Sequence, residues 1–182
     1  MSRKKPYTTG EKSFTRIEYN KLLAVCNTLE DEIMLKLGVE LGLRRSDMAA
    51  LLISNVDFEE SKLKYVEKKK GNRIMTVFLS PPLIQLLQKY LNSLPKRQKK
   101  VFTCGGRQLY NRLNDLCLKA EIPKRPIHAL RATCIKFHQA AGWSITEVAK
   151  LIGDSPKVVE LHYATPSEDE MRELTHTKNV IT

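Results

Sequence analysis

The chain is organised around residues 128–163, which read HALRATCIKFHQAAGWSITEVAKLIGDSPKVVELHY. A histidine and an arginine three positions apart, here His128 and Arg131, lie on one face of a helix. Tyr163, on a later element, can approach that face. These side chains supply a proton or hydrogen-bond donor, a planar cation that fits a phosphate, and a nucleophilic oxygen. A phosphoryl-transfer site requires such groups, and the question for the remaining sequence is whether it supplies the others.

Length and composition predict one ordinary globular domain. The chain has 182 residues, of which 42% are hydrophobic and 28% charged, and this length supports one full core. No uncharged apolar run reaches ~18 residues, the length that spans a bilayer. The basic N-terminus is not followed by the apolar core of a secretory signal. We therefore expect a cytoplasmic protein whose four cysteines are reduced thiols.

The formal net charge is +11 at pH 7, and such an excess points to a polyanionic partner. Nucleic acid is favoured over an anionic membrane, because no predicted helix has a basic face opposite a wide apolar face. The cysteines form no C-x-x-C pair, and no acidic metal cluster is written in the sequence. We therefore expect neither a metal nor a cofactor.

The apolar pattern predicts a mainly α-helical domain with a small antiparallel β-hairpin or sheet, an α+β architecture. Residues 1–13 are polar and basic and resemble a tail or linker remnant, whereas residues 14–182 are expected to form a single domain. A last helix, at about 167–176, has only two apolar side chains with which to pack. It is expected to pack on its own domain or on a neighbouring copy.

Helix signals recur along this domain. Thr15 opens a capping box, and Gly42 ends a second helix that is apolar on most sides. Ser46 is expected to cap the short helix that follows. Further helix starts are predicted at the proline pair 81–82, after the glycine pair 105–106, at His128, at Ser144 and at Ser155.

At residues 62–80 the apolar pattern changes to an alternation of every second residue, which predicts a hairpin with a Gly-Asn turn. Glu67 lies on the same face as Leu63 and Tyr65, and we interpret it as structural. A tip with four cations can reach into a DNA groove. These cations are Lys68, Lys69, Lys70 and Arg73.

Four boxes resemble those of the catalytic domain of the tyrosine recombinases, the phage, archaeal-virus and Xer-type integrase family. GLRRSD (42–47) is similar to the family's first arginine box, and the lysine-rich hairpin is similar to its catalytic-lysine hairpin. HALR (128–131) and LIGD (151–154) resemble its histidine-x-x-arginine and leucine-glycine-histidine boxes, and Tyr163 follows Gly153 by ten residues, as in the family. Each box is weak alone, but their shared order over residues 14–165 is a strong signal.

The resemblance implies that Tyr163 attacks a DNA phosphodiester and leaves a 3′-phosphotyrosine and a free 5′-hydroxyl. Arg44 and Arg131 are the implied catalytic arginines, which neutralise charge on the phosphate oxygens as planar forks. The covalent intermediate conserves the bond energy, so neither ATP nor a metal is implied.

The remaining site roles also come from the resemblance. His128 is implied to hold a phosphate oxygen or to relay the proton of the tyrosine, and Asp47 is the implied supporting acid. The lysine that protonates the leaving 5′-oxygen is Lys70 if the alignment is anchored on the Gly-Asn turn. It is Lys69 if the turn is aligned as a shorter one.

Double-stranded DNA is the implied partner, and a dimer or tetramer on DNA is the implied assembly, in the cytoplasm of a bacterial, archaeal or virus-infected cell. The helix junction after Gly42 and a proline-bearing loop before His128 add basic residues to those of the hairpin. The expected DNA-binding residues are Arg45, Lys68, Arg73, Lys124 and Arg125.

The sequence departs from the family pattern in two ways. Asp154 stands where the family usually has histidine or tryptophan, and a carboxylate cannot donate a hydrogen bond to a phosphate unless it is protonated. Either a neighbour such as His162 substitutes, or the site tolerates the loss, or Asp154 points away. The family's N-terminal core-binding domain has no counterpart here, so we expect a catalytic-domain fragment or a minimal recombinase.

Two other classes of protein remain open from the sequence. Residues 144–163 form two short helices around Gly153, as in a non-enzymatic helix-turn-helix regulator. That alternative explains the charge but leaves the Arg44 box and the hairpin without a role. A DNA-relaxing relative of the type IB topoisomerase kind, or an inactive DNA-binding relative, is the other alternative, because of Asp154.

Overall fold

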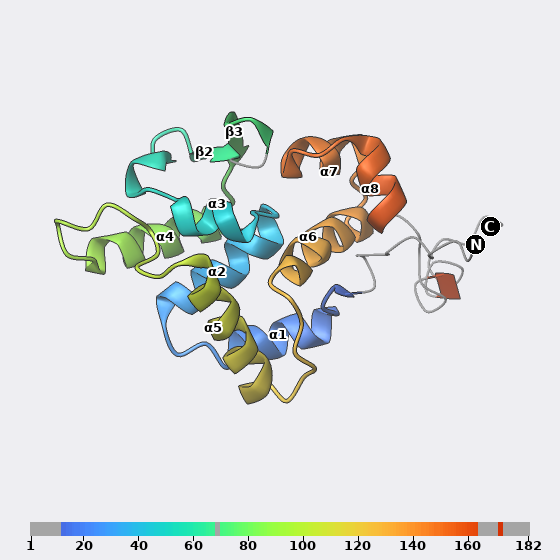
Figure 1. The fold of residues 1–182 in the computed structure, drawn as a ribbon, viewed down its shortest axis with the longest axis horizontal. Helices are drawn as coiled ribbons and strands as arrows, with labels where there is room; N and C mark the ends of the chain where they lie inside the picture. Colours follow the sequence, from blue (N-terminus) through green and yellow to red (C-terminus); the bar gives the residue numbers. More distant parts are fainter. Residues whose placement is uncertain (1–11, 68–69, 164–170, 173–182) are drawn as a thin grey trace.

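Helices make up most of the protein, and one antiparallel sheet of three strands lies at its edge (Figure 1). The computed structural model describes residues 12–67, 70–163 and 171–172. The architecture confirms the predicted mainly helical α+β class. None of the helices in these ranges is long and apolar enough to cross a membrane.

The first half of the chain carries the sheet. The capping box at Thr15 is present, since its side chain accepts from the backbone of Glu18 and the Glu18 side chain accepts from the backbone of Thr15. The elements are α1 (Arg16–Ala24), α2 (Leu29–Glu40), α3 (Arg45–Ala50), the 3-10 helix η2 (Ile53–Asn55), β1 (Val56–Asp57), β2 (Lys62–Glu67) and β3 (Arg73–Phe78).

The second half of the chain is helical. Ser80 caps the helix that the proline pair opens, and Ser144 forms the predicted capping box. The expected helix at about 167–176 lies outside the described residues apart from Met171 and Arg172. The elements are α4 (Pro81–Ser93), α5 (Gly106–Lys119), α6 (His128–Ala140), α7 (Ile145–Ile152) and α8 (Pro156–Tyr163).

The start of α3 differs from the prediction. Arg44, with extended backbone, is the N-cap residue, and no side chain caps the helix. Ser46 therefore lies inside the first turn, where its hydroxyl donates to the carboxylate of Asp47 over 3.2 Å. The predicted Ser46 cap was wrong because the chain turns into the helix directly after Arg44.

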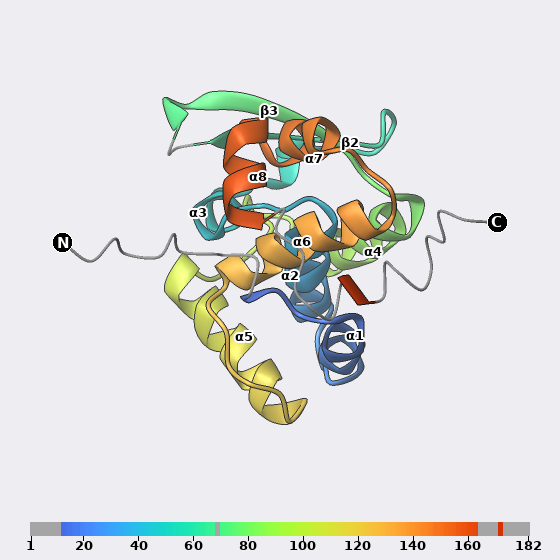
Figure 2. The same cartoon turned by 90° about the vertical axis from the view of Figure 1, so that its right-hand side faces the viewer.

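Helix α6 lies between two layers, and its residues 129–135 are buried. One face packs on α2, and its other face packs on α7 and α8 (Figure 2). Gly38 allows the close approach of α2, because a Cβ atom there would lie 2.7 Å from the Cβ atom of Leu130. On the far face, Cys134 and Ile135 belong to a second apolar cluster with residues of α7 and α8.

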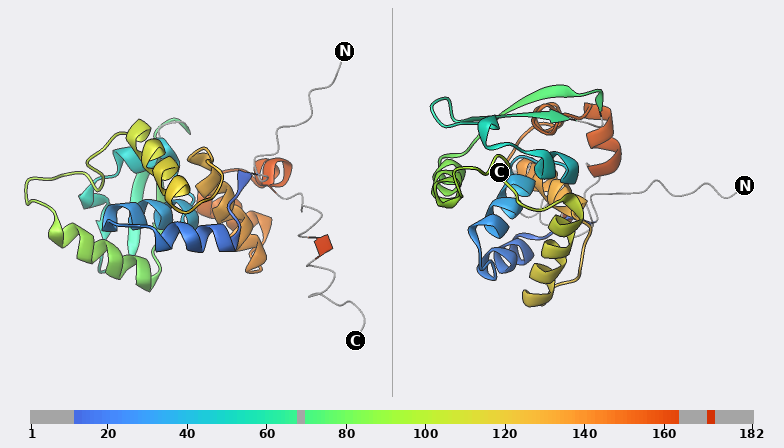
Figure 3. Two further views of the ribbon diagram at one scale, coloured as in Figure 1. Left: turned by 90° about the horizontal axis from the view of Figure 1, so that it is seen from below. Right: turned by 60° about the vertical axis from the view of Figure 1, so that its left-hand side comes forward.

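The sheet lies on the opposite side of α2 from α1 and α5 (Figures 1 and 3). Its strand order is β1-β2-β3, and the hairpin register pairs Glu67 with Arg73. The predicted alternation is present, since Leu63, Tyr65 and Glu67 are all buried. The strand β1 extends the expected hairpin to a sheet. This arrangement turns the end of the hairpin toward the turn between α7 and α8.

We expect Gly42→Ala to lower the free energy of unfolding by more than backbone strain alone would. Gly42 follows α2 with φ +64°, and a Cβ atom there would lie 2.7 Å from Cγ2 of Ile152 and 3.3 Å from Sγ of Cys134. The left-handed backbone costs roughly 1 kcal/mol for alanine, and the crowding adds about 1–3 kcal/mol. Unfolding by urea measures the sum.

The matched control is Gly71→Ala, which has nearly the same backbone angle, φ +68°, and nothing within 4 Å of the added carbon. It should lose only the strain contribution. Equal losses of unfolding free energy for the two variants would show that the contact between Gly42 and α7 is not tight.

Candidate active site

Two arginines that are far apart in the sequence meet on one carboxylate. Arg44, the N-cap residue of α3, donates from Nη2 to Oδ2 of Asp154 over 3.2 Å. Arg131, on α6, donates from Nη2 to the same oxygen over 2.5 Å. The two guanidinium groups therefore converge on a single anionic position.

Arg131 is a structural bridge as well as a cation. Its side chain is 1% exposed, and its Nη1 donates to the carbonyl oxygen of Gly42 over 2.7 Å. Its Nη2 also donates to the carbonyl oxygen of Ile152 over 2.8 Å. Because these carbonyls follow α2 and end α7, one guanidinium fixes both layers around α6. Its Nε has no hydrogen-bond partner among the described residues.

The hairpin adds a third cation to the same carboxylate. The Nζ atom of Lys70 donates to Oδ1 of Asp154 over 2.5 Å and to the carbonyl oxygen of Gly153 over 2.9 Å. Lys70, one of the two candidate lysines, thus lies with the two arginines. Lys69, the other candidate, and Lys68 lie outside the described residues.

Glu67 is a site residue that the sequence analysis did not identify. Its side chain is fully buried and accepts hydrogen bonds from Arg44 on one side and from Arg73 on the other. Arg73 also donates to the carbonyl oxygen of Gly153 over 2.7 Å. The predicted face alternation placed Glu67 inward, and a buried carboxylate requires a cationic partner, so that pattern was the available signal.

Gly153 allows the hairpin to approach the turn between α7 and α8. It has φ +72°, and a Cβ atom there would lie 2.6 Å from Nη2 of Arg73 and 2.9 Å from Oε1 of Glu67. Only glycine combines this backbone conformation with such close neighbours. The leucine-glycine box therefore has a steric reason in this chain.

The candidate nucleophile and base are in direct contact. Nε2 of His128, at the start of α6, lies 2.8 Å from the hydroxyl oxygen of Tyr163, at the end of α8. Tyr163 is 5% exposed and packs in the apolar cluster between α6 and α8. The ring of His162 lies edge-on to that of Tyr163, with 6.3 Å between centroids. The imidazole of His128 and the phenol of Tyr163 are thus within hydrogen-bonding distance.

The pKa values of Asp154 and Asp47 are shifted in opposite directions. Burial raises the pKa of Asp154, but the hydrogen bond from Lys70 and the charges of Arg131 and Arg44 outweigh it and hold the pKa below its usual range. Burial raises the pKa of Asp47, which the hydrogen bond from Ser46 only partly offsets. Asp154 is therefore a firmly ionised carboxylate at neutral pH, and it does not point away from the site.

The remaining expected DNA-binding residues divide into two groups. Arg125 makes two hydrogen bonds with the carboxylate of Glu18 and lies over the ring of Phe14, so its guanidinium is engaged in packing of the N-terminal helix. Lys124 and Arg45 are exposed. No salt bridge of Arg45 is found within the described part of the chain.

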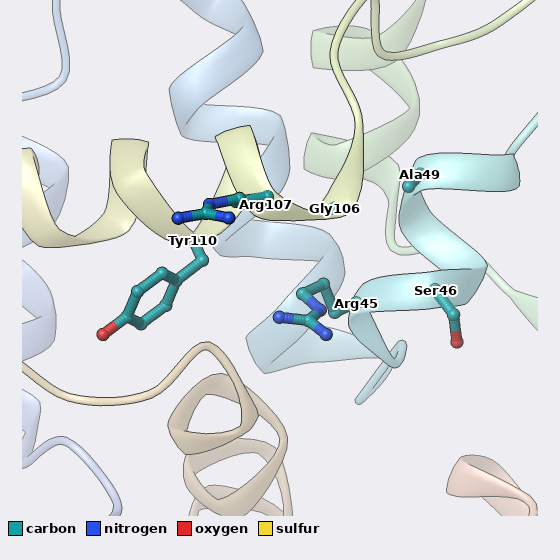
Figure 4. A pocket seen from close by; sticks show the side chains of 6 residues that line it. All are labelled: Arg45, Ser46, Ala49, Gly106, Arg107 and Tyr110. Carbon is teal, nitrogen blue, oxygen red and sulfur yellow. The ribbon is translucent and has the colours of Figure 1, made fainter.

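Arg45 lies in a surface hollow that the sequence analysis did not predict (Figure 4). Arg107 and Tyr110 project from the start of α5 beside it, and Gly106 packs against the stem of Arg45. A neighbouring hollow shares Arg45 and Tyr110 and reaches Arg44 and His128. A basic, aromatic depression therefore leads from the candidate active site to α5.

A metal centre is not built among the residues that the structure describes, because no three histidine, cysteine or carboxylate side chains gather there. The cysteines in these ranges are free thiols, of which Cys117 and Cys134 are buried. Burial raises the pKa of the Cys134 thiol to about 12, so this thiol is protonated at neutral pH and is not a reactive thiolate.

Known sequences resemble this chain over most of its length. The sequence profile of the Phage integrase family matches residues 12–169. Tyrosine recombinase XerA of Saccharolobus solfataricus is 28% identical over 142 residues, 78% of this chain and 48% of that protein. Prophage integrase IntF of Escherichia coli K12 is 30% identical over 145 residues, 72% of this chain and 30% of that protein. The chain spans about half the length, or less, of these curated relatives.

Solved structures share the fold. The crystal structure of XerA recombinase has a TM-score of 0.81 at 20% identity and covers 93% of this chain and 66% of that chain. The catalytic domain of bacteriophage HP1 integrase has a TM-score of 0.65 at 19% identity, over 92% and 95%. XerH recombinase bound to difH substrate has a TM-score of 0.69 at 18% identity, over 98% and 56%. The chain belongs to the phage integrase family, the tyrosine recombinases.

Proposed function

We propose that this chain is the catalytic domain of a site-specific DNA recombinase that cuts and rejoins strands through a 3′-phosphotyrosyl intermediate. The observation that carries the proposal is the contact of Tyr163 with His128, 2.8 Å between oxygen and nitrogen, in a fold where Arg44 and Arg131 converge on one anionic position. Family membership gives these residues their order, and the geometry supports their roles.

In the cleavage step, the hydroxyl oxygen of Tyr163 attacks the scissile phosphorus. A phenol has a pKa of about 10 and is a weak nucleophile at neutral pH, so a base must take its proton. His128 accepts that proton at Nε2 when this nitrogen is unprotonated. The new bond joins phosphorus to the tyrosine oxygen.

The bond that breaks joins phosphorus to the 5′-oxygen, which leaves with a proton from Lys70. Arg44 and Arg131 donate to the non-bridging oxygens, where negative charge is greatest in the transition state. Glu67 holds Arg44 from the buried side. Rejoining reverses these steps with another 5′-hydroxyl, so the energy of the phosphodiester is conserved in the tyrosyl bond.

Double-stranded DNA is the proposed partner. We place its backbone along the depression that runs from Arg44 and His128 to Arg45, Arg107 and Tyr110, with the hairpin on the other side of the scissile phosphate. Strand exchange needs several active sites, so a dimer or tetramer on DNA is proposed as the working assembly. Its site of action is proposed to be the cytoplasm of a bacterial, archaeal or virus-infected cell.

The regulator alternative is less favoured. A helix-turn-helix protein has no need of a buried arginine beside a lysine-bearing hairpin, yet both are part of the same ion-pair network here. A DNA-relaxing enzyme of the type IB topoisomerase kind shares the chemistry, and supercoil relaxation by the purified protein would separate the two activities.

Tyr163→Phe should abolish the covalent complex with DNA and leave DNA affinity nearly unchanged, because only the nucleophilic oxygen is removed. The measurement is a denaturing gel after incubation with a suicide duplex, which is nicked so that the cut strand cannot rejoin. Tyr19→Phe, the same change at a residue that packs on Phe137 away from the site, should retain the band. A covalent band from Tyr163→Phe would show that another residue is the nucleophile.

Arg45→Gln and Arg107→Gln should weaken DNA binding similarly for all sequences. Each removes one phosphate contact, so the slope of log K against log salt should fall by about 1 per variant. Fluorescence anisotropy at several salt concentrations measures both quantities. Lys119→Gln, at the far end of α5, makes the same charge change outside the hollow and serves as the control. If the salt slopes of these two variants equal that of Lys119→Gln, the DNA does not bind along this hollow.

A further inference from the structure

Asp154 occupies the position at which the catalytic cations converge. Its two oxygens together accept hydrogen bonds from Arg44, Arg131 and Lys70. In the proposed function, these three cations surround the scissile phosphate and the oxygen that leaves it. The carboxylate therefore holds a place that a non-bridging phosphate oxygen requires.

Because Arg131 is buried, a phosphate can reach it only if the carboxylate of Asp154 moves away. At 1% exposure, its guanidinium cannot be touched by any outside anion unless a neighbouring group moves. Two of its partners are backbone carbonyls that fix α2 and α7, and their departure would disrupt the fold. Asp154 is its one charged partner in the described part of the chain, and this carboxylate lies in a turn.

We propose that Asp154 is an internal substitute for the DNA phosphate, which holds the three cations together in the free protein and is displaced when the scissile phosphate binds. This inference rests on the proposed function, because it takes the phosphate position from it. A carboxylate and a phosphodiester each carry one negative charge, so the exchange leaves the charge balance of the site unchanged.

The side chain of Asp154 can leave the cations by rotation about its own χ angles, while Lys70 and Arg73 hold the turn through the carbonyl oxygen of Gly153. Asp154 follows the left-handed Gly153 that ends α7 and lies two residues before Pro156, the first residue of α8. Its side chain can therefore leave the cations while both helices persist. Tyr163 is the last residue of α8, so displacement of Asp154 acts at the base of the element that carries the nucleophile.

The charges around Asp154 support its role as a replacement for the phosphate. The cations hold the pKa of Asp154 below its usual range although burial raises it. A depressed pKa adds stability that is present above the ordinary pKa of the carboxyl group and is lost as the pH falls through the lowered value. That loss lies below pH ~4. Asp154→Asn should lack this acid-dependent part of the stability, because it cannot ionise.

The test compares Asp154→Asn with wild type in two measurements. Without added anions, the variant should unfold at a lower temperature, because three cations lose their counter-charge. Inorganic phosphate should raise its unfolding temperature more than that of wild type. Its Kd for an uncleaved duplex should be about tenfold lower, as expected if the carboxylate vacates the site about one tenth of the time.

Asp57→Asn is the matched control. It removes the same charge from a partly exposed carboxylate that pairs with Lys62 on the sheet, away from the site. If Asp154→Asn gains no more affinity for phosphate or DNA than this control, Asp154 is a fixed anchor and the inference is overturned. If Asp154→Asn folds only when inorganic phosphate is present, the inference is supported, and failure to fold in both conditions overturns it.

The outcomes separate the inference from the proposed function. The phosphate measurement needs no DNA cleavage. A wild-type protein that forms no covalent complex on any duplex would contradict the recombinase proposal, whatever the phosphate result. A wild-type protein that forms the complex, with Asp154→Asn equal to the control, would contradict only the displacement of Asp154.

Discussion

The hydrogen bonds of Arg131 are the constraint on which the site depends. One buried guanidinium joins the carbonyl oxygens of Gly42 and Ile152 and the carboxylate of Asp154. Removal of this side chain would leave two buried carbonyls without a donor, which costs about 1–3 kcal/mol for each unsatisfied group. The same side chain thus positions the layers around α6 and presents the positive charge that a phosphate requires.

The second constraint is the buried carboxylate of Glu67. It orients Arg44 and Arg73 from inside the protein, and the hairpin is thereby joined to the first arginine box. Because Lys70 bonds to the turn between α7 and α8, elements from three separate parts of the sequence surround one position. The contact between His128 and Tyr163 then places the proposed nucleophile at the start of α6, next to its proposed base.

Much of this arrangement could be predicted from the sequence, because helix caps and the order of the boxes are local signals. The helices that begin after Thr15 and Ser144 and the hairpin were predicted on such signals. The sequence did not reveal the role of Glu67, since its partners are set by tertiary packing. It also left the direction of Asp154 open, because residue type does not determine which group a side chain meets. The prediction of a cap at Ser46 was wrong because α3 begins directly after Arg44, whose backbone is extended.

The most direct measurement is mass spectrometry of the protein trapped on a suicide duplex and digested with protease. We expect a nucleotide joined through its 3′-phosphate to the peptide that contains Tyr163. An adduct on a different residue would contradict the assigned site. The absence of any adduct, from protein that binds the duplex, would contradict the strand-cleavage chemistry itself.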